Sequence, residues 1–508
     1  MSSGTAADAR ESVEELASPK SQAPQAQQAP QSQQPPRGRF AISNWFRPVE
    51  ADLLVYFRIV FGLAMLYWVG RQLVTGNVTA SYTTPRIHFH YYGYEWVNSL
   101  TAPWMQIHFG VLGICAALIV VGCCCRLATL LVAMGFTYVF LIDKCLYLNH
   151  HYLICLLAWL LTIMPLGAAF SVDAWRAGER ESATVPVWTI WLLRFQIGVP
   201  YFFGGIAKLN PDWLAGEPMR MMLQARSSYP VVGEWFTQEW CVQMFVWGGL
   251  GLDLLVVPGL LWARTRPFAY FAAVVFHLIN AWLFPIGIFP WFMIFATVVF
   301  FPPGSIRALS GRRSGLPDSP SAVTPTTLRQ RLLIVFLMGY VALQLVIPLR
   351  HFLQPGNPSW TEEGHYFAWH MMLRGKKCAL RYYATDPRTN RTGTIDLRTF
   401  VTPFQLARCS RDPRMIHELA LTIADDLRQR GAPKMEVRAL SLVSLNGRKP
   451  QLMIDPRVDL AAEPVTYAAP EWIVPLREPL RKEPWNVPLS EWESRLLRPD
   501  DSLNVKRR

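Results

Sequence analysis

The chain contains 508 residues, of which 51% are apolar, 13% aromatic and only 17% charged. Such a composition excludes a typical soluble protein and indicates a membrane protein. The net charge of +13 does not indicate binding to nucleic acid, because the arginines lie mostly in short loops between apolar runs and in the C-terminal third.

Residues 1–45 are predicted to form a disordered N-terminal tail. Most of this segment is rich in Gln, Ser, Ala and Pro, a composition that cannot bury a hydrophobic core. It has no apolar stretch after a basic start, and we therefore do not interpret it as a signal peptide.

Residues 46–350 are predicted to form a multi-span helical membrane domain. About nine apolar runs occur in it, and several approach the ~20 residues that an α-helix needs to cross a bilayer. They lie near residues 51–70, 104–122, 127–143, 148–167, 186–206, 243–262, 267–284, 288–302 and 331–349. The run at 288–302 is short enough for a re-entrant segment.

The distribution of arginine and lysine between the connecting loops predicts the orientation in the membrane. With the N-terminus in the cytoplasm, the inner loops hold about twice as many of these residues as the outer loops. An odd number of spans then places the C-terminal part on the outer or lumenal face. We therefore predict a multi-pass integral membrane protein with a cytoplasmic N-terminus.

Residues 351–480 are predicted to form a strand-rich α+β domain outside the membrane. The stretches CALRYYATD, TGTIDLRTF, MEVRALSLVSL and KPQLMIDPRVDL alternate apolar and polar residues, as half-buried strands do. Between them, DPRMIHELALTIADDLRQRG has the periodicity of a helix that stops at Gly431. Residues 481–508 are predicted to form a charged, proline-containing tail.

The nine cysteines form no CxxC pair that would indicate a metal site. Cys123, Cys124 and Cys125 lie in an apolar context, which favours a place in the core or lipidation over metal binding. In the polar C-terminal part, Cys378 and Cys409 are candidates for a disulfide, and the sequence does not decide whether they pair.

Polar side chains from distant segments are expected to converge at one membrane depth, beneath the outer domain. The fifth apolar run ends at the outer surface, the fourth begins there, and the seventh ends there. The first outer loop adds further candidates. The residues concerned are Lys208, Asn149, His150, His151, His277, Asn280, His88, His90 and Glu95. This convergence predicts a functional site at the outer membrane surface.

Lys208 has two interpretations. It closes the apolar stretch YFFGGIAK, and the helix is expected to end near it because residue 210 precedes a proline. A lysine at a helix C-terminus is favoured by the helix dipole and can reach the interface as an anchor. To act as a base instead, it must be present as the free amine, which burial favours. His150, taken alone, is equally compatible with an ordinary interfacial histidine.

Other polar residues in the apolar runs have structural alternatives too. His277 and Asn280 lie one turn apart, so a hydrogen bond between helices is the default for them. Arg194 and Gln196 lie within the fifth run. An arginine inside a membrane is costly enough to indicate function, and Asp253 is its candidate partner.

At these residues the chain resembles the vitamin K-dependent gamma-glutamyl carboxylases, a family with a horizontally transferred transmembrane domain. The stretch YFFGGIAKLNPDW resembles the segment that bears the family's catalytic lysine, which falls on Lys208. The stretch LNHHYLICLLAW resembles the segment that bears its catalytic histidine, which falls on His150. Further matches keep their order along the chain: SVDAW, FHLINAWLFPIGIFPW, QLVIPLRHFLQPGNPSW, FAWHMML and MIDPRVDL.

The resemblance implies a distinctive reaction. Lys208, as the free amine, deprotonates vitamin K hydroquinone, whose oxidation by O2 to the epoxide generates a base strong enough to remove the γ-proton of a peptide glutamate. CO2 traps the carbanion as γ-carboxyglutamate, and His150 assists at that stage. No metal is expected. The implied partners are the lipid bilayer and a glutamate-containing peptide or protein, not nucleic acid. Contacts to the cofactor are expected from Asn149, Arg194, Gln196, Tyr201, His277 and Asn280.

The chain differs from the vertebrate members of this family at several positions. Ala207 stands where they have a second lysine, and Gly364 with His365 stands where they have a Leu-Tyr pair in the glutamate-recognition region. Quinol epoxidation without glutamate carboxylation is therefore an alternative function.

Two other classes are alternatives. A membrane di-metal oxidase needs more histidines than the motifs HFH and NHH supply. A non-enzymatic transporter predicts internal repeats, and the two halves of the chain show no clear self-similarity. For the carboxylase, we predict that Lys208→Ala leaves the fold intact and abolishes quinol oxidation.

Overall fold

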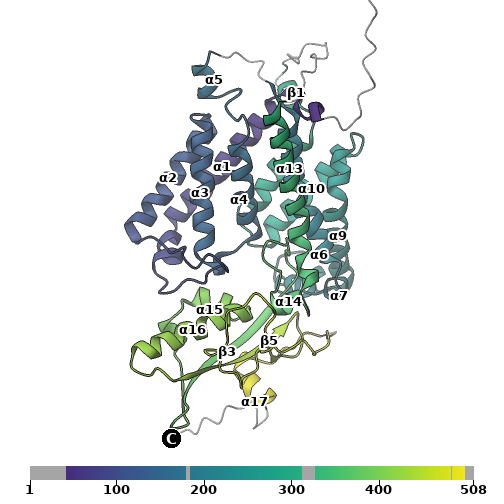
Figure 1. The fold of residues 1–508 in the computed structure, drawn as a ribbon. Helices are drawn as coiled ribbons and strands as arrows, with labels where there is room; N and C mark the ends of the chain where they lie inside the picture. Colours follow the sequence, from purple (N-terminus) through teal and green to yellow (C-terminus); the bar gives the residue numbers. More distant parts are fainter. Residues whose placement is uncertain (1–41, 179–183, 310, 312–326, 482, 498–508) are drawn as a thin grey trace, which may run out of the picture. The chain divides into compact units, whose positions relative to one another are not determined.

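The computed structural model describes residues 42–178, 184–309, 311, 327–481 and 483–497. Within them, six helical segments are long and apolar enough to cross a membrane. They are α1 (Asp52–Val74), α2 (Ala102–Val121), α3 (Cys125–Ile142), α6 (Val187–Lys208), α9 (Glu239–Leu261) and Leu328–Leu353, which comprises α13 (Leu328–Val346) and η6 (Ile347–Leu353). Figure 1 shows these helices and the C-terminal sheet.

The remaining predicted runs are helical but shorter or less apolar. They form α4 (Asn149–Thr162), α10 (Arg266–Leu283) and the pair α11 (Phe289–Ala296) and η5 (Thr297–Phe300). Every predicted run therefore contains a helix, and the predicted fold class of this part, a helical membrane domain, is confirmed. The count of nine spans is not confirmed and stays a prediction.

Burial separates the central from the peripheral helices. In the most apolar window of α6, 72% of the residues are buried inside the protein, whereas the corresponding share for α13 is 17%. A helix that is apolar all round and largely exposed is suited to contact with lipid. Helix α6 therefore lies in the interior of the bundle and α13 at its periphery.

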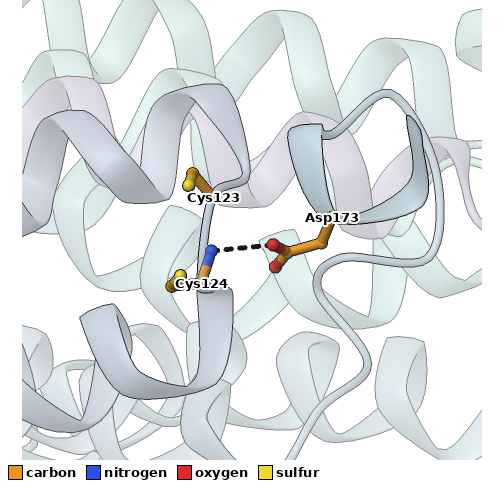
Figure 2. Close-up of side chains that lie close together, drawn as sticks. All are labelled: Cys123, Cys124 and Asp173. Atoms are coloured by element: carbon orange, nitrogen blue, oxygen red, sulfur yellow. Dashed lines mark hydrogen bonds between the residues drawn. The ribbon is translucent and has the colours of Figure 1, made fainter. Parts of the chain in front are cut away.

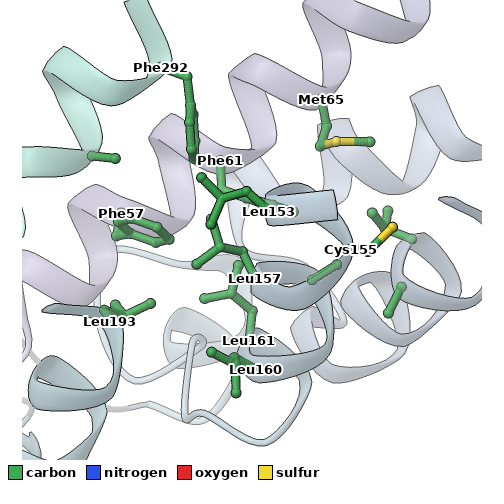
Figure 3. Packing of buried hydrophobic residues seen from close by; sticks show 14 of the residues in the cluster. Phe57, Phe61, Met65, Leu153, Cys155, Leu157, Leu160, Leu161, Leu193 and Phe292 are labelled. Carbon is green, nitrogen blue, oxygen red and sulfur yellow. The ribbon is translucent and has the colours of Figure 1, made fainter. Parts of the chain in front are cut away.

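The short helix α4 is held by the apolar core of the membrane part. Its residues Leu153, Leu157 and Leu161 follow one another at a spacing of four, so they share one face, and all three are fully buried. Figure 3 shows them packed among side chains of neighbouring helices, including Phe57, Phe61, Met65, Leu193 and Phe292. This packing fixes the position of the first turn of α4, which bears His150.

The C-terminal part contains a four-stranded antiparallel sheet with the strand order β4-β3-β5-β6. The strands are β3 (Lys376–Asp386), β4 (Arg391–Thr394), β5 (Glu436–Leu445) and β6 (Gln451–Leu452). Helices α15 (Pro403–Cys409) and α16 (Pro413–Gln429) lie between β4 and β5 in the chain. The expected helix stop is confirmed, since α16 ends two residues before Gly431, which has a φ of +88°.

Helix α16 packs on the sheet through an apolar face. Its residues Met415, Ile416, Leu419 and Ile423 are buried, and the hydroxyl of Tyr382 in β3 donates to the carbonyl of Ile416 over 2.6 Å. The strand-rich α+β class of this part is therefore confirmed.

Shorter elements connect these parts. They are η1 (Ile42–Phe46), β1 (Pro48–Glu50) paired with β2 (Thr184–Pro186), η2 (Thr79–Thr83), η3 (Lys144–Leu146), α5 (Val172–Arg176), α7 (Pro211–Leu214), α8 (Met219–Gln224), η4 (Trp235–Thr237), α12 (Ser305–Leu309), α14 (Pro358–Thr361), η7 (Leu397–Thr399), η8 (Leu489–Glu491) and α17 (Trp492–Leu496).

The two predicted tails fall largely outside the described residues. Of the segment 1–45 only the last four residues are described, within η1. Within 481–508, helix α17 is described, and its Trp492 is buried. All nine cysteines are free thiols, so Cys378 and Cys409 do not form a disulfide.

Candidate functional site

Helix α6 ends at Lys208 because the sequence that follows starts another helix. The side chain of Asn210 accepts a hydrogen bond from the backbone N–H of Trp213 over 3.0 Å and so caps α7, which begins with Pro211. The same side chain donates to the carbonyl of Ala207 over 2.8 Å, at the end of α6. The predicted helix end is therefore confirmed, and Lys208 occupies a fixed position.

The side chain of Lys208 is buried and contacts a carboxylate. Its Nζ lies 2.5 Å from Oδ2 of Asp253 in α9 and 3.3 Å from the carbonyl oxygen of Gly204. It also lies 5.1 Å from the centre of the Trp213 ring, in a cation–π arrangement. A lysine that anchors a helix keeps its ammonium group in water, whereas Lys208 is only 5% exposed. The anchoring interpretation does not describe this environment.

Two glycines allow the contact between α6 and α9. A Cβ atom at Gly205 would lie 2.6 Å from Cδ2 of Leu254, and one at Gly204 would lie 3.3 Å from Oδ2 of Asp253. Both distances are shorter than ordinary van der Waals contacts. The Gly204–Gly205 pair therefore lets α9 approach closely enough for Asp253 to reach Lys208.

Lys208 and Asp253 line a cavity of about 810 Å³. Seven of the predicted site residues contribute to its wall, namely Lys208, His150, His151, Asn149, Tyr201, His277 and Asn280. Helices α4, α6, α9 and α10 all supply lining residues, so the expected convergence of these segments is found.

The polar residues of the cavity are oriented by contacts with one another. The ring of His150 stacks on that of Phe289, with centroids 5.3 Å apart. The Nδ2 group of Asn149 donates to the carbonyl of His370 over 3.2 Å. The hydroxyl of Tyr201 lies 2.6 Å from Nε2 of His277. These contacts hold the side chains in place around the cavity.

Arg194 and Gln196 are not among the lining residues. Arg194 donates to the carbonyls of Val299 and Phe301 over 2.9 and 2.8 Å, so Asp253 is not its partner, contrary to our expectation. Gln196 accepts a hydrogen bond from the hydroxyl of Tyr340. Both side chains thus bind other parts of the helical bundle, and their placement gives no support to contacts with a cofactor.

The polar residues predicted in the first outer loop, His88, His90 and Glu95, do not line the cavity, although Asn77 of the same loop does. His88 pairs with Asp143 over 3.2 Å, and the backbone N–H of His90 donates to Glu418 over 2.8 Å. Glu95 accepts a hydrogen bond from the backbone of Gly93 within the loop itself. The loop therefore joins the membrane part to α16, and it contributes Asn77 to the described lining rather than the three predicted residues.

The wall supplied by the C-terminal part, which we call the cationic end of the cavity, carries an excess of positive charge that the sequence did not lead us to expect. It includes Arg374, Lys376, Arg408 and Arg411, together with the carboxylates of Glu362 and Asp412. Arg374 and Lys376 both pair with Glu362, over 2.7 and 2.6 Å. Among the described residues, the guanidinium groups of Arg408 and Arg411 form no ion pair. Burial lowers the pKa of Arg408, and the guanidinium groups of Arg411 and Arg374 lower it further. This end is therefore suited to an anion.

The segment that bears FAWHMML has an unusual backbone. Glu362, Phe367, Trp369 and Met372 all have positive φ angles, between 58° and 64°, which non-glycine residues rarely adopt. His370 in the same segment lines the cavity, and neither of its ring nitrogens has a hydrogen-bond partner in the described structure. Backbone outliers of this kind cluster at functional sites.

A group of potential metal ligands lies outside the cavity, where α2 meets α3. Cys123, Cys124 and Asp173 have ligand atoms within 4.8 Å of one another (Figure 2). The carboxylate of Asp173 accepts hydrogen bonds from the backbone N–H groups of Cys124 and Cys125, over 2.8 and 2.9 Å. Since it thereby satisfies the N-terminus of α3, this arrangement is that of a helix cap.

Comparisons with known proteins identify both parts of the chain. The family model described as "HTTM domain" matches residues 46–304. The family model described as "Vitamin K-dependent gamma-carboxylase, lumenal domain" matches residues 329–479 and indicates that the C-terminal part is lumenal. No solved structure matches the chain. With both models matched in succession, the chain belongs to the vitamin K-dependent gamma-carboxylase family.

Proposed function

We propose that the protein is a membrane-embedded carboxylase that oxidises vitamin K hydroquinone to its epoxide with O2 and carboxylates peptide glutamate with CO2. The observation that carries this proposal is one cavity with two chemically different ends. Lys208 lines the end among the membrane helices, and Arg408 and Arg411 line the end in the C-terminal part. A lipid-soluble quinol and a water-soluble peptide need such a shared space.

The membrane end of the cavity has the properties that a bicyclic quinol requires. Its volume of about 810 Å³ lies within the range typical of small-molecule sites. Aromatic residues such as Trp68, Phe276 and Phe289 supply apolar walls, and Lys208 supplies a polar group for a hydroxyl. When bound, vitamin K hydroquinone supplies an oxidisable ring, whose conversion to the epoxide provides a base stronger than any side chain.

Lys208 would hold the first proton. Its Nζ, as the free amine, accepts a hydroxyl proton from the quinol, and the lysinium so formed stays next to Asp253. The rings around it, including Trp213, exclude water from the site, which preserves a strong base from quenching. His150, on the neighbouring helix α4, is proposed to hold or donate a proton at the carboxylation stage.

The guanidinium groups at the other end would bind the glutamate side chain. Burial and the neighbouring Arg411 lower the pKa of Arg408, and both guanidinium groups would gain a counter-charge from a carboxylate. Gly364 and His365 replace the Leu-Tyr pair of the vertebrate members, so the arginines take on the main part of recognition in this chain.

Epoxide formation and CO2 incorporation test the proposal separately. The full chain in detergent would receive reduced vitamin K, O2 and labelled bicarbonate, together with a glutamate-containing peptide. We expect the wild type to form epoxide and carboxylated peptide. Lys208→Ala is expected to form neither, and His150→Ala is expected to form epoxide while carboxylation falls by about 10²–10⁴-fold.

Lys208→Ala needs a control because it leaves Asp253 buried without its counter-charge, which costs about 3–5 kcal/mol. The double variant Lys208→Ala/Asp253→Asn removes this cost and is the matched control for folding. Epoxide formation by either variant would overturn the assignment of Lys208. Epoxide without carboxylated peptide from the wild type would favour the epoxidase alternative, and a folded protein that leaves the quinol unchanged would favour transport.

A further inference from the structure

We propose that Asp253 is the positioning residue that makes Lys208 a base, because its carboxylate orients the amine and neutralises the lysinium that forms. The contact between the two side chains is observed, whereas its role in catalysis rests on the proposed function. Asp253 is 3% exposed, and its Oδ2 lies 2.5 Å from Nζ of Lys208. Among the described residues, each is the other's only ion-pair partner.

The two hydrogen bonds of Lys208 define the direction in which it can accept a proton. A free amine has two N–H donors and one lone pair. In this structure Nζ has two acceptors within the protein, Oδ2 of Asp253 and the carbonyl oxygen of Gly204, 3.3 Å away. With both donors directed to these oxygens, only the lone pair is left for the cavity, which Lys208 lines. The amine is thus oriented before any ligand binds.

The charges balance in the proton transfer. Before it, the amine and the quinol are neutral and the carboxylate of Asp253 carries one negative charge. The O–H bond of the quinol breaks, an N–H bond forms on Lys208, and the electron pair of the broken bond stays on the quinol oxygen. After it, lysinium and carboxylate form a neutral pair beside the quinolate, so the total charge is unchanged. Without Asp253, a buried cation would form with no partner in the protein.

A carboxylate is required rather than an amide. Asparagine at position 253 would retain an oxygen that accepts a hydrogen bond from Nζ, but it would not carry the charge. An opposite charge within about 4–6 Å changes the protonation midpoint of a group by about 1–3 pH units. Asp253→Asn therefore separates the electrostatic role of this residue from its role in holding the lysine in place.

The first test measures the protonation of Lys208 in protein that contains no quinone. A membrane-permeant acylating reagent modifies only the free amine, and mass spectrometry of the peptide that contains Lys208 gives the extent of labelling at each pH. We expect the labelling midpoint of Asp253→Asn to lie about 1–3 pH units below that of the wild type. Asp425→Asn, at an exposed side chain, removes the same charge elsewhere and is expected to leave the midpoint unchanged. An unchanged midpoint in Asp253→Asn would overturn the inference.

The second test follows epoxide formation against pH. The rate falls at low pH as the amine becomes protonated, so this acid limb is expected to move to lower pH in Asp253→Asn by the same amount as the labelling midpoint. The maximal rate is expected to fall at least about ten-fold, because a less basic amine takes the proton more slowly. A lower maximal rate with an unmoved acid limb would show a merely structural role and overturn the inference.

A third variant keeps the inference testable if Asp253→Asn does not fold. Asp253→Glu retains the charge but lengthens the side chain, so the labelling midpoint should stay close to that of the wild type while the epoxide rate falls. A midpoint that moves down in this variant would contradict the electrostatic role. Because labelling uses no quinone, a wild type that forms no epoxide would overturn the proposed function, whereas the labelling result would still decide the role of Asp253.

Discussion

A single buried residue, His370, can make the stability of the folded protein sensitive to acid. Burial lowers the pKa of its imidazole from 6.5 to about 3, and the neighbouring His351, Arg374 and Arg350 add to this effect. Between these two pH values the unfolded chain binds a proton at this position and the folded chain does not. The free energy of unfolding therefore decreases as the pH falls through this window.

We expect this residue alone to lower the free energy of unfolding by about 2 kcal/mol between pH 6.5 and pH 5. Thermal unfolding in detergent, followed by tryptophan fluorescence, measures the effect. His370→Gln removes the titrating group and should lose less stability over the same interval, although other buried histidines continue to titrate. An equal loss in the variant and the wild type would refute this prediction.

The sequence pointed to Lys208 and His150 through its resemblance to a family, but it did not reveal the partner of Lys208. Asp253 was expected to pair with Arg194, which lies in the same helix as Lys208. The two cations are separated by about 21 Å along α6, given the rise of 1.5 Å per residue, so Asp253 can serve only one of them. Which one it serves depends on how α9 lies against α6. Gly204 and Gly205 decide this contact, but the sequence alone does not show which helix packs against them.

At the scale of elements, the contact between α6 and α9 depends on Gly205. A Cβ atom there would lie 3.2 Å from the backbone nitrogen of Leu254 as well as close to its side chain, so α9 would have to move. We expect Gly205→Ala to separate Asp253 from Lys208 and to lower the rate of epoxide formation at least about ten-fold.

The control for Gly205→Ala is Gly251→Ala in α9. A Cβ atom at Gly251 would have no atom within 4 Å beyond its own helix, so both the rate and the melting temperature should be retained. The two variants make the same chemical change in neighbouring helices. Equal activity in both would mean that the close approach of α6 and α9 is not needed.

Most elements could be predicted from periodicity, and the exceptions have physical reasons. The ends of α6 and α16 follow from Pro211 and Gly431, whose backbone preferences act locally. The end of α4 also has a local cause that the predicted run 148–167 overlooked, because Pro165 follows three residues after its last residue, Thr162. The stretch TGTIDLRTF was expected to be one strand, but β4 covers only its start and is followed by η7.

At the scale of the whole molecule, a buried ion pair joins the membrane part to the C-terminal part. Arg448 forms two hydrogen bonds with the carboxylate of Asp212, over 2.7 and 2.6 Å, and Asn446 donates to the same carboxylate over 2.8 Å. Asp212 lies in α7, immediately after the helix that bears Lys208. The sheet of the C-terminal part is thereby connected to the lysine through only a few residues.

Breaking this pair is expected to destabilise the protein strongly. Asp212→Asn leaves the Arg448 guanidinium buried without its counter-charge, which should lower the free energy of unfolding by about 3–5 kcal/mol. Thermal unfolding measures this loss, and the double variant Asp212→Asn/Arg448→Met should recover part of it. Asp425→Asn breaks the pair of Asp425 with Arg428, in which both side chains are 61% exposed, and should cost no more than about 1 kcal/mol. Comparable losses in Asp212→Asn and Asp425→Asn would contradict the inference that the buried pair stabilises the protein more than the exposed one.

The cationic end of the cavity could not be predicted from the sequence. Arg374 precedes β3, whereas Arg408 lies in α15 and Arg411 between α15 and α16. Nothing in the spacing of these residues marks them as neighbours, since only the folding of the chain around the sheet brings them together. Local patterns and the family resemblance therefore located residues at the membrane end of the cavity, whereas the residues of the cationic end required the three-dimensional structure.

The shared wall of the cavity has a consequence for how such chains evolve. Residues of the helices and of the C-terminal part line the same space, so neither part encloses it alone. A gene that kept only the helical part would encode the lysine but not the guanidinium groups. Chains that carboxylate peptides are therefore expected to inherit both parts together, whereas a helical part joined to a different partner domain should retain quinol chemistry and act on another substrate.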